Sequence, residues 1–65
     1  MKEMKTIWTR RRLITAWEVD GQYEVTVFDA DSMAYLEGFS RKFEEHEGAV
    51  DFATDIAHWF ERITA

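Results

Sequence analysis

Two carboxylates and a histidine near the C-terminus have the residue types and spacing of a metal site. Asp51, Asp55 and His58 lie at positions i, i+4 and i+7, which an α-helix places on one side. Nothing elsewhere in the sequence supplies a fourth ligand in the manner of an H-E-x-x-H motif. The same spacing is typical of a solvated helix face, so we predict no bound metal and no other cofactor.

Side chains suited to nucleophilic chemistry are few. The chain has no cysteine and no glycine-rich phosphate loop, so the candidates are Ser32, Ser40 and the threonines. The bases available to them are His46 and His58. A serine triad needs an oriented histidine and an oxyanion hole, and the sequence contains no G-x-S-x-G pattern. We therefore predict that the protein is not an enzyme.

Three consecutive arginines, Arg10 to Arg12, form the densest basic group of the chain. Residues 1–12 hold five basic residues and one acidic residue, a net charge of +4, whereas residues 13–65 hold three basic and twelve acidic residues, a net charge of −9. The negative body repels phosphate backbones, which disfavours nucleic acid as a partner. Three interpretations of the arginines stay open: pairing with carboxylates of this chain, contact with an acidic protein, and DNA binding.

The overall composition predicts one small domain. The chain has 65 residues, of which 46% are hydrophobic and 15% aromatic, and its net charge is −5. A domain of this length buries about 60% of the surface that the unfolded chain exposes, so residues 1–65 have room for a single core. No apolar run approaches the roughly 18 residues of a membrane span or the roughly 7–15 of a signal-peptide core. We therefore predict a cytoplasmic protein without membrane contact.

The strongest local signal is a β-hairpin. Asp20-Gly21 lies between two runs rich in β-branched and aromatic residues, 13–19 and 22–28. A two-residue type I′ turn pairs positions whose numbers sum to 41, as those of Asp20 and Gly21 do. The predicted pairs are Ala16–Val25, Ile14–Val27, Trp17–Glu24, Leu13–Phe28, Arg12–Asp29 and Arg10–Asp31.

The predicted register gives this hairpin two apolar faces, because successive side chains alternate between the faces. One face carries Ile14, Ala16, Tyr23, Val25 and Val27, and the other carries Leu13, Thr15, Trp17, Val19 and Phe28. One helix covers only one face of such a sheet, so the second face stays exposed to a partner. Residues 1–9 are expected to be flexible or to fold over that face. The predicted partner-binding residues are Trp17, Phe28, Leu13, Arg11 and Trp8.

An amphipathic helix is predicted over residues 45–63. Its apolar residues recur at intervals of three and four, and Arg62 lies near the negative end of the helix dipole. The apolar positions are Ala49, Phe52, Ala53, Ile56, Trp59, Phe60 and Ile63.

The segment from Asp31 to Phe43 fits two structures. Its apolar residues recur at helical intervals, but they also alternate as in a strand with Gly38 at a bulge. A helix ending near Glu47 would crowd three glutamates at its negative end, and a strand avoids this conflict. We therefore predict a three-stranded antiparallel sheet followed by one amphipathic helix (β-β-β-α), with β-β-α-α as the alternative.

The junction between the third strand and the helix has a familiar spacing. The Phe43, Ala49, Phe52, Ala53 pattern resembles the same junction in small three-stranded-sheet-plus-helix domains, such as the arm-binding domains of phage integrases. That resemblance covers about a quarter of the chain, and it implies DNA binding through a basic sheet face. The matching strands here carry Glu18, Glu24 and Glu37 instead.

These observations favour a small non-enzymatic regulator or inhibitor that binds another protein, of the kind encoded by phages and mobile elements. It would act by occlusion through its aromatic sheet face, or by nucleic-acid mimicry through an acidic surface. The carboxylates of that acidic surface are Glu18, Asp20, Glu24, Asp29, Asp31 and Glu37. The alternatives are a homodimer that buries the open face against its own copy and a DNA-binding domain that uses Arg10–Arg12.

Overall fold

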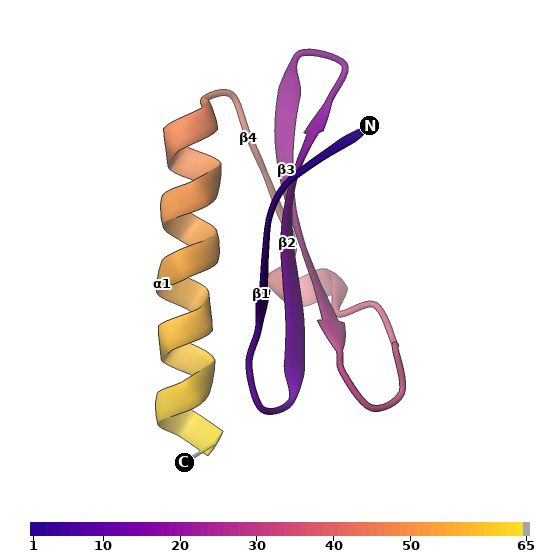
Figure 1. Ribbon diagram of the computed structural model, residues 1–65, viewed down its shortest axis with the longest axis vertical. Coiled ribbons are helices and arrows are strands. Elements are labelled where there is room, and N and C mark those ends of the chain that lie inside the picture. The colour runs from indigo at the N-terminus through magenta and orange to yellow at the C-terminus, as the bar shows by residue number, and fades with distance from the viewer. Residues whose placement is uncertain (65) are drawn as a thin grey trace.

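A computed structural model describes residues 1–64 as a four-stranded antiparallel sheet followed by one helix. The strands are β1 (Lys2–Trp8), β2 (Arg12–Val19), β3 (Gln22–Asp29) and β4 (Arg41–Phe43). A short 3-10 helix, η1 (Glu37–Phe39), precedes β4, and the helix α1 (His46–Thr64) follows it. The strands lie in the order β1-β2-β3-β4, with α1 on one side of the sheet (Figure 1). The predicted α+β class with a C-terminal helix is confirmed, whereas the predicted number of three strands is wrong.

The central hairpin of β2 and β3 has the predicted register. Leu13 pairs with Phe28, Ala16 with Val25, and each pair in between follows the same rule. The turn uses positive φ at both central residues, 50° at Asp20 and 79° at Gly21, as a type I′ turn requires. The ladder ends at the pair of Arg12 and Asp29. The predicted extension to Arg10 and Asp31 is wrong because β2 begins at Arg12.

The N-terminal segment forms the strand that sequence reasoning missed. β1 pairs with β2 along the sheet edge, so residues 2–8 extend the sheet and do not fold over its face. A two-residue turn of Arg10 and Arg11 joins the two strands, with the Thr9 N–H donating to the Arg12 carbonyl at 2.9 Å. Neither turn residue is Gly or Asn, and neither has positive φ. The residue types that mark most short hairpins are therefore missing from this turn.

The segment between β3 and α1 is mostly loop, and only its end is a strand. β4 pairs with β3 over three residues, which confirms a strand that runs into the helix. The preceding residues form an isolated bridge from Tyr35 to Phe28 and then η1. The helical alternative, β-β-α-α, is therefore wrong. Gly38 lies in η1 and not at a strand bulge.

The core lies between α1 and the helix-facing side of the central hairpin. Small residues on α1 let the helix lie close to the sheet, and Phe60 closes the core at the C-terminal end of the helix. Each fully buried large apolar side chain contributes about 1.5–3 kcal/mol. The buried core residues are Ile14, Ala16, Val25, Val27, Ala49, Ala53, Ala57 and Phe60.

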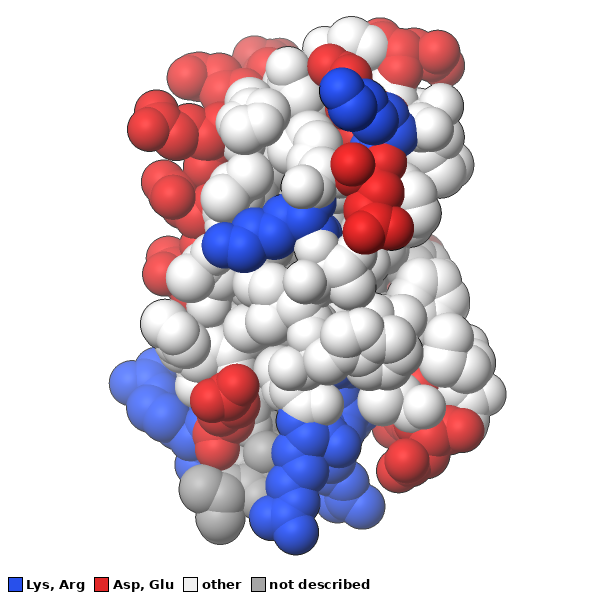
Figure 2. Space-filling view, viewed as in Figure 1, with Lys and Arg blue, Asp and Glu red and all other residues white. Residues whose placement is uncertain are grey.

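Charge is segregated along the molecule. Figure 2 shows carboxylates along the outer side of α1 and a group of Lys and Arg at the lower end. That end holds the turn of Arg10 and Arg11 together with the last turn of α1, which carries Arg62 (Figure 1). Within residues 1–64, no helix has the length and apolarity needed to cross a membrane.

Candidate functional site

The sheet face that points away from α1 is the first candidate site. Directly paired residues share a face, so the register assigns side chains from all four strands to it. We call this surface the open face, because within residues 1–64 the helix covers only the opposite side (Figure 1). Its members are Glu3, Thr6, Trp8, Leu13, Thr15, Trp17, Val19, Gln22, Glu24, Thr26, Phe28, Tyr35 and Lys42.

Hydrogen bonds within the open face hold its central polar groups. The Trp17 indole N–H donates to Thr26 Oγ1 at 2.9 Å, which fixes the ring against the sheet. The hydroxyls of Thr6 and Thr15 lie 3.4 Å apart, and Thr15 is buried. Satisfied polar groups do not compete for a ligand's hydrogen bonds, so the middle of this face presents mainly hydrocarbon and ring surface.

An aromatic cluster lies on the open face at one end of the strands. Trp8 is 63% exposed and Tyr35 is 47% exposed. Leu13 lies between them in register, paired with Trp8 on one side and with Phe28 on the other. The Phe28 and Tyr35 rings are 5.3 Å apart. Contiguous exposed aromatic surface of this kind marks an interaction site more often than scattered single residues do.

Both edges of the sheet are poorly suited to pairing with another strand. The outer edge of β1 carries Lys2 and Lys5, and its register shifts at a bulge between Glu3 and Lys5. On the other side, the loop before β4 occupies the free groups of β3. The Leu36 N–H donates to the Val27 carbonyl at 2.8 Å, and the Asp29 N–H donates to the Ala34 carbonyl at 2.9 Å. Extension of the sheet by a partner strand is therefore disfavoured at both edges.

The three arginines have different environments. Arg12 faces α1: its guanidinium lies 3.4 Å from Asp29 Oδ2 and 5.1 Å from the centre of the Phe60 ring. The predicted pairing of Arg12 with Asp29 is thus confirmed. Arg10 and Arg11 are exposed in the β1–β2 turn, next to the Trp8 end of the open face.

Asp29 also organises the turn that follows β3. Its Oδ1 accepts hydrogen bonds from the Ser32 and Asp31 N–H groups, at 3.0 and 2.9 Å. These two donors, with a smaller contribution from Arg12, hold the pKa of Asp29 below its ordinary value. Its negative charge therefore has a role within the fold.

The carboxylates expected to form one acidic surface lie on different parts of the molecule. Glu18 and Asp29 face the helix side at opposite ends of the central hairpin, whereas Glu24 lies on the open face opposite Trp17 and Lys42. The remaining three, Asp20, Asp31 and Glu37, are exposed in the two turns that flank β3 and in η1. The densest carboxylate group is instead at the start of α1, and its members are Glu44, Glu45, Glu47 and Asp51.

Side chains considered for catalysis have other roles in the fold. Ser40 Oγ donates to the Leu36 carbonyl and accepts from the Val27 N–H, both at 3.2 Å. Ser32 Oγ accepts from the Ala34 N–H at 3.2 Å. The ring of His46 packs edge-on against Tyr23, with the centroids 5.7 Å apart.

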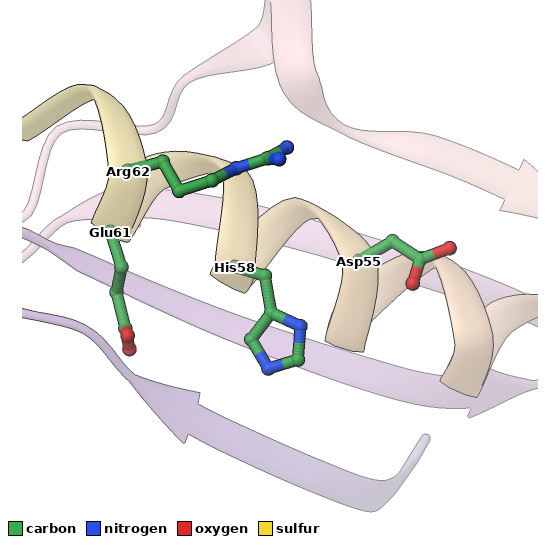
Figure 3. A pocket seen from close by; sticks show the side chains of 4 residues that line it. All are labelled: Asp55, His58, Glu61 and Arg62. Atoms are coloured by element: carbon green, nitrogen blue, oxygen red, sulfur yellow. The ribbon is translucent and has the colours of Figure 1, made fainter.

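The outer side of α1 carries a hollow of about 630 Å³, lined by Asp55, His58, Glu61 and Arg62. Figure 3 shows these four side chains fanning out from the helix without converging on one point. Among the described residues, no group of three or more Asp, Glu or His side chains is arranged to hold a metal ion. This hollow is therefore a solvated helix surface.

Comparison of the chain with protein-family models, curated proteins and solved structures finds no match in any of the three. The register predicted from the sequence placed Leu13, Trp17 and Phe28 on one face, and the structure confirms this placement. Trp8 lies on the same face because β1 pairs it with Leu13. Sequence reasoning missed Tyr35, because its position depends on a long-range bridge to Phe28. The hairpin register could have predicted that Thr26 lies on the open face, because Thr26 pairs with Thr15.

Proposed function

We propose that this protein is a non-enzymatic binding domain whose open face docks on an apolar surface of another protein. The observation that carries the proposal is a four-stranded sheet that, within residues 1–64, the helix covers on one side, with Trp8 and Tyr35 exposed on the other. A regulator of this kind acts by occlusion, because the surface it covers on the partner is no longer free for other ligands. The six carboxylates predicted to form an acidic surface lie on different parts of the molecule, which favours occlusion over nucleic-acid mimicry.

The size of the open face supports a transient interface. The molecule measures 35 × 21 × 18 Å, and Figure 1, viewed down the shortest axis, shows the sheet nearly edge-on. The open face therefore spans at most roughly 600 Å², which corresponds to about 1,200 Å² of buried surface when both partners are counted. That area lies at the lower limit for specific complexes and well below that of obligate dimers. A heterologous, reversible partner fits this area better than a permanent second copy.

Trp8 is the side chain expected to contribute most to binding. At 63% exposure it leaves about 150 Å² for a partner to bury, equivalent to about 3–4 kcal/mol at 25 cal/mol per Å². Tryptophan is also the residue most often found as an interface hot spot. Because Trp8 contributes little to the core, its removal should affect binding much more than folding.

Crosslinking at chosen positions in the native cell tests the proposal. A photoreactive phenylalanine analogue is introduced at Trp8 in one variant and at His58, on the outer side of α1, in the control. We expect Trp8 to capture one particular protein and His58 not to capture it. Equal capture at both positions would overturn the proposal. Capture of this chain alone at Trp8 would replace it with self-association.

DNA binding by Arg10 and Arg11 predicts a different result. Because Arg12 is held by Asp29, two exposed guanidinium groups remain in the β1–β2 turn. Neutralising about two phosphates gives only a weak dependence of affinity on salt. We expect no shift of duplex DNA in a titration at about 50 mM salt, and a measurable affinity there would favour the DNA-binding alternative.

A further inference from the structure

A second apolar surface lies on the helix side of the molecule, separate from the open face. It is a groove of about 360 Å³ between α1 and the segment that leads into β4. One wall is the helix stripe of Phe52, Ile56 and Trp59, at positions i, i+4 and i+7. The other wall is formed by residues 38–41. The volume lies at the lower end of the range for ligand sites, and suits one large side chain.

Contacts around the groove fix the positions of its two walls. The Phe39 ring packs against Trp59 at 5.9 Å and against Phe60 at 5.0 Å between centroids. Two hydrogen bonds of Ser40 Oγ, described above, fix the wall opposite the helix. Phe39 and Trp59 are nevertheless 37% and 40% exposed. A preformed apolar groove binds an apolar group without a large ordering cost.

Arg41 provides a positive charge at this groove. Its guanidinium carbon lies 5.7 Å from the centre of the Phe52 ring, which lines the groove, and 5.4 Å from the Phe43 ring. Within residues 1–64 the structure contains one ion pair, between Arg12 and Asp29, so Arg41 has no carboxylate partner. A guanidinium stacked on aromatic rings keeps its N–H groups directed outward, where they match the two oxygens of a carboxylate.

We propose that this groove binds the C-terminal residue of a partner protein, with a large apolar side chain between the walls and the terminal carboxylate on Arg41. The guanidinium lies directly over a wall of the groove, so the anion and the apolar group must be close together. A C-terminal residue carries both on one carbon atom. Glu37, which directly precedes Gly38 in one wall, and the net charge of −5 disfavour a ligand that carries several acidic groups.

The proposal is tested by following the backbone amide and indole N–H signals of the full chain by NMR during peptide titrations. The first probe is an N-acetylated tripeptide, Gly-Gly-Phe, with a free C-terminus, and the second is the same peptide with a C-terminal amide. A third, amidated peptide places phenylalanine before an internal aspartate. We expect saturable shifts at Gly38, Ser40 and the Trp59 indole, with the free acid binding about five-fold more tightly than either amidated peptide.

Two pairs of variants assign the binding to the groove. A Cβ at Gly38 would meet no atom within 4 Å, and the φ of Gly38 is not positive, so larger residues fit without strain. Gly38→Glu places a carboxylate beside the groove and should abolish binding, whereas Gly38→Ala should preserve it. Arg41→Gln should remove the preference for the free acid. Lys42→Gln, on the opposite face of the same strand, should keep that preference.

Several results would overturn this inference. They are the absence of saturable shifts with the free acid at about 10 mM, equal affinity for the acid and the amide, and shifts confined to the Trp8 and Trp17 indoles. Equal or tighter binding of the internal aspartate peptide would also overturn it, since the recognised anion would then be an acidic side chain. The inference does not depend on the open face, so either proposal can fail alone.

Discussion

Replacing Phe60 by alanine removes the largest fully buried side chain of the domain. Phe60 is 1% exposed and lies in the last part of α1, where its ring contacts the Phe39 and Trp59 rings and the guanidinium of Arg12. It therefore joins the helix to the sheet and to the loop before β4. We expect Phe60→Ala to remove a large part of the free energy of unfolding.

The expected loss follows from burial and domain size. Truncation of a buried Phe to Ala costs about 3–5 kcal/mol, including the cavity that it leaves. At about 0.05–0.15 kcal/mol per residue, a chain of 65 residues has a total stability of roughly 3–10 kcal/mol. The loss is therefore at least about a third of the free energy of unfolding. Phe60→Leu keeps most of the apolar volume and should cost about 1–2 kcal/mol.

Urea unfolding followed by circular dichroism at the helix band measures both variants. With a slope of about 1 kcal/mol per M for a domain of this size, Phe60→Leu should lower the midpoint by about 1–2 M. Ile63→Ala is the control, because Ile63 lies on the same helix but is 56% exposed, and it should change stability by less than about 0.5 kcal/mol. A loss below about 1 kcal/mol for Phe60→Ala, or equal losses for Phe60→Ala and Ile63→Ala, would refute this description of the core.

Two further substitutions test the turns. Gly21→Ala places a Cβ on a residue with φ of 79° and should cost about 1 kcal/mol in urea unfolding, while a loss near zero would contradict the type I′ turn. The pKa of Asp29 is lowered in the folded state, so its stabilising contribution is complete above the ordinary value of 3.8 and disappears as the pH falls through the lower folded value. Asp29→Asn should therefore be less stable than the wild type at neutral pH, and its free energy of unfolding should fall less on acidification. If the free energy of unfolding of the two proteins changes with pH in parallel, Asp29 does not have this role.

Local signals made the central hairpin and α1 predictable. The Asp20-Gly21 turn sets the register of β2 and β3, and the apolar stripe of α1 follows the helical repeat. That register alone located Leu13, Trp17 and Phe28 on the face opposite the helix. Both elements depend on interactions between residues close in the sequence, so the sequence pattern alone predicts them.

The remaining elements depend on contacts that no local pattern records. In β1, the bulge near Met4 breaks the alternation of side chains, so Lys5 and Ile7 face the helix where a regular strand would not place them. The turn of Arg10 and Arg11 has no glycine to signal it. The loop before β4 is positioned by distant partners, such as the Val27 N–H that donates to Ser40. Tyr35 and the groove beside Phe39 depend on that loop and were therefore missed.

The affinity of the protein captured by crosslinking at Trp8, measured by calorimetry against purified variants, tests the central claim most directly. If the open face is the binding surface, Trp8→Ala should weaken binding at least about ten-fold, because the loss exceeds about 1.4 kcal/mol. His58→Ala, on the outer side of α1, should change it less than about two-fold. Undiminished binding by Trp8→Ala, or an equal loss in both variants, would contradict the assignment of the open face as the binding surface.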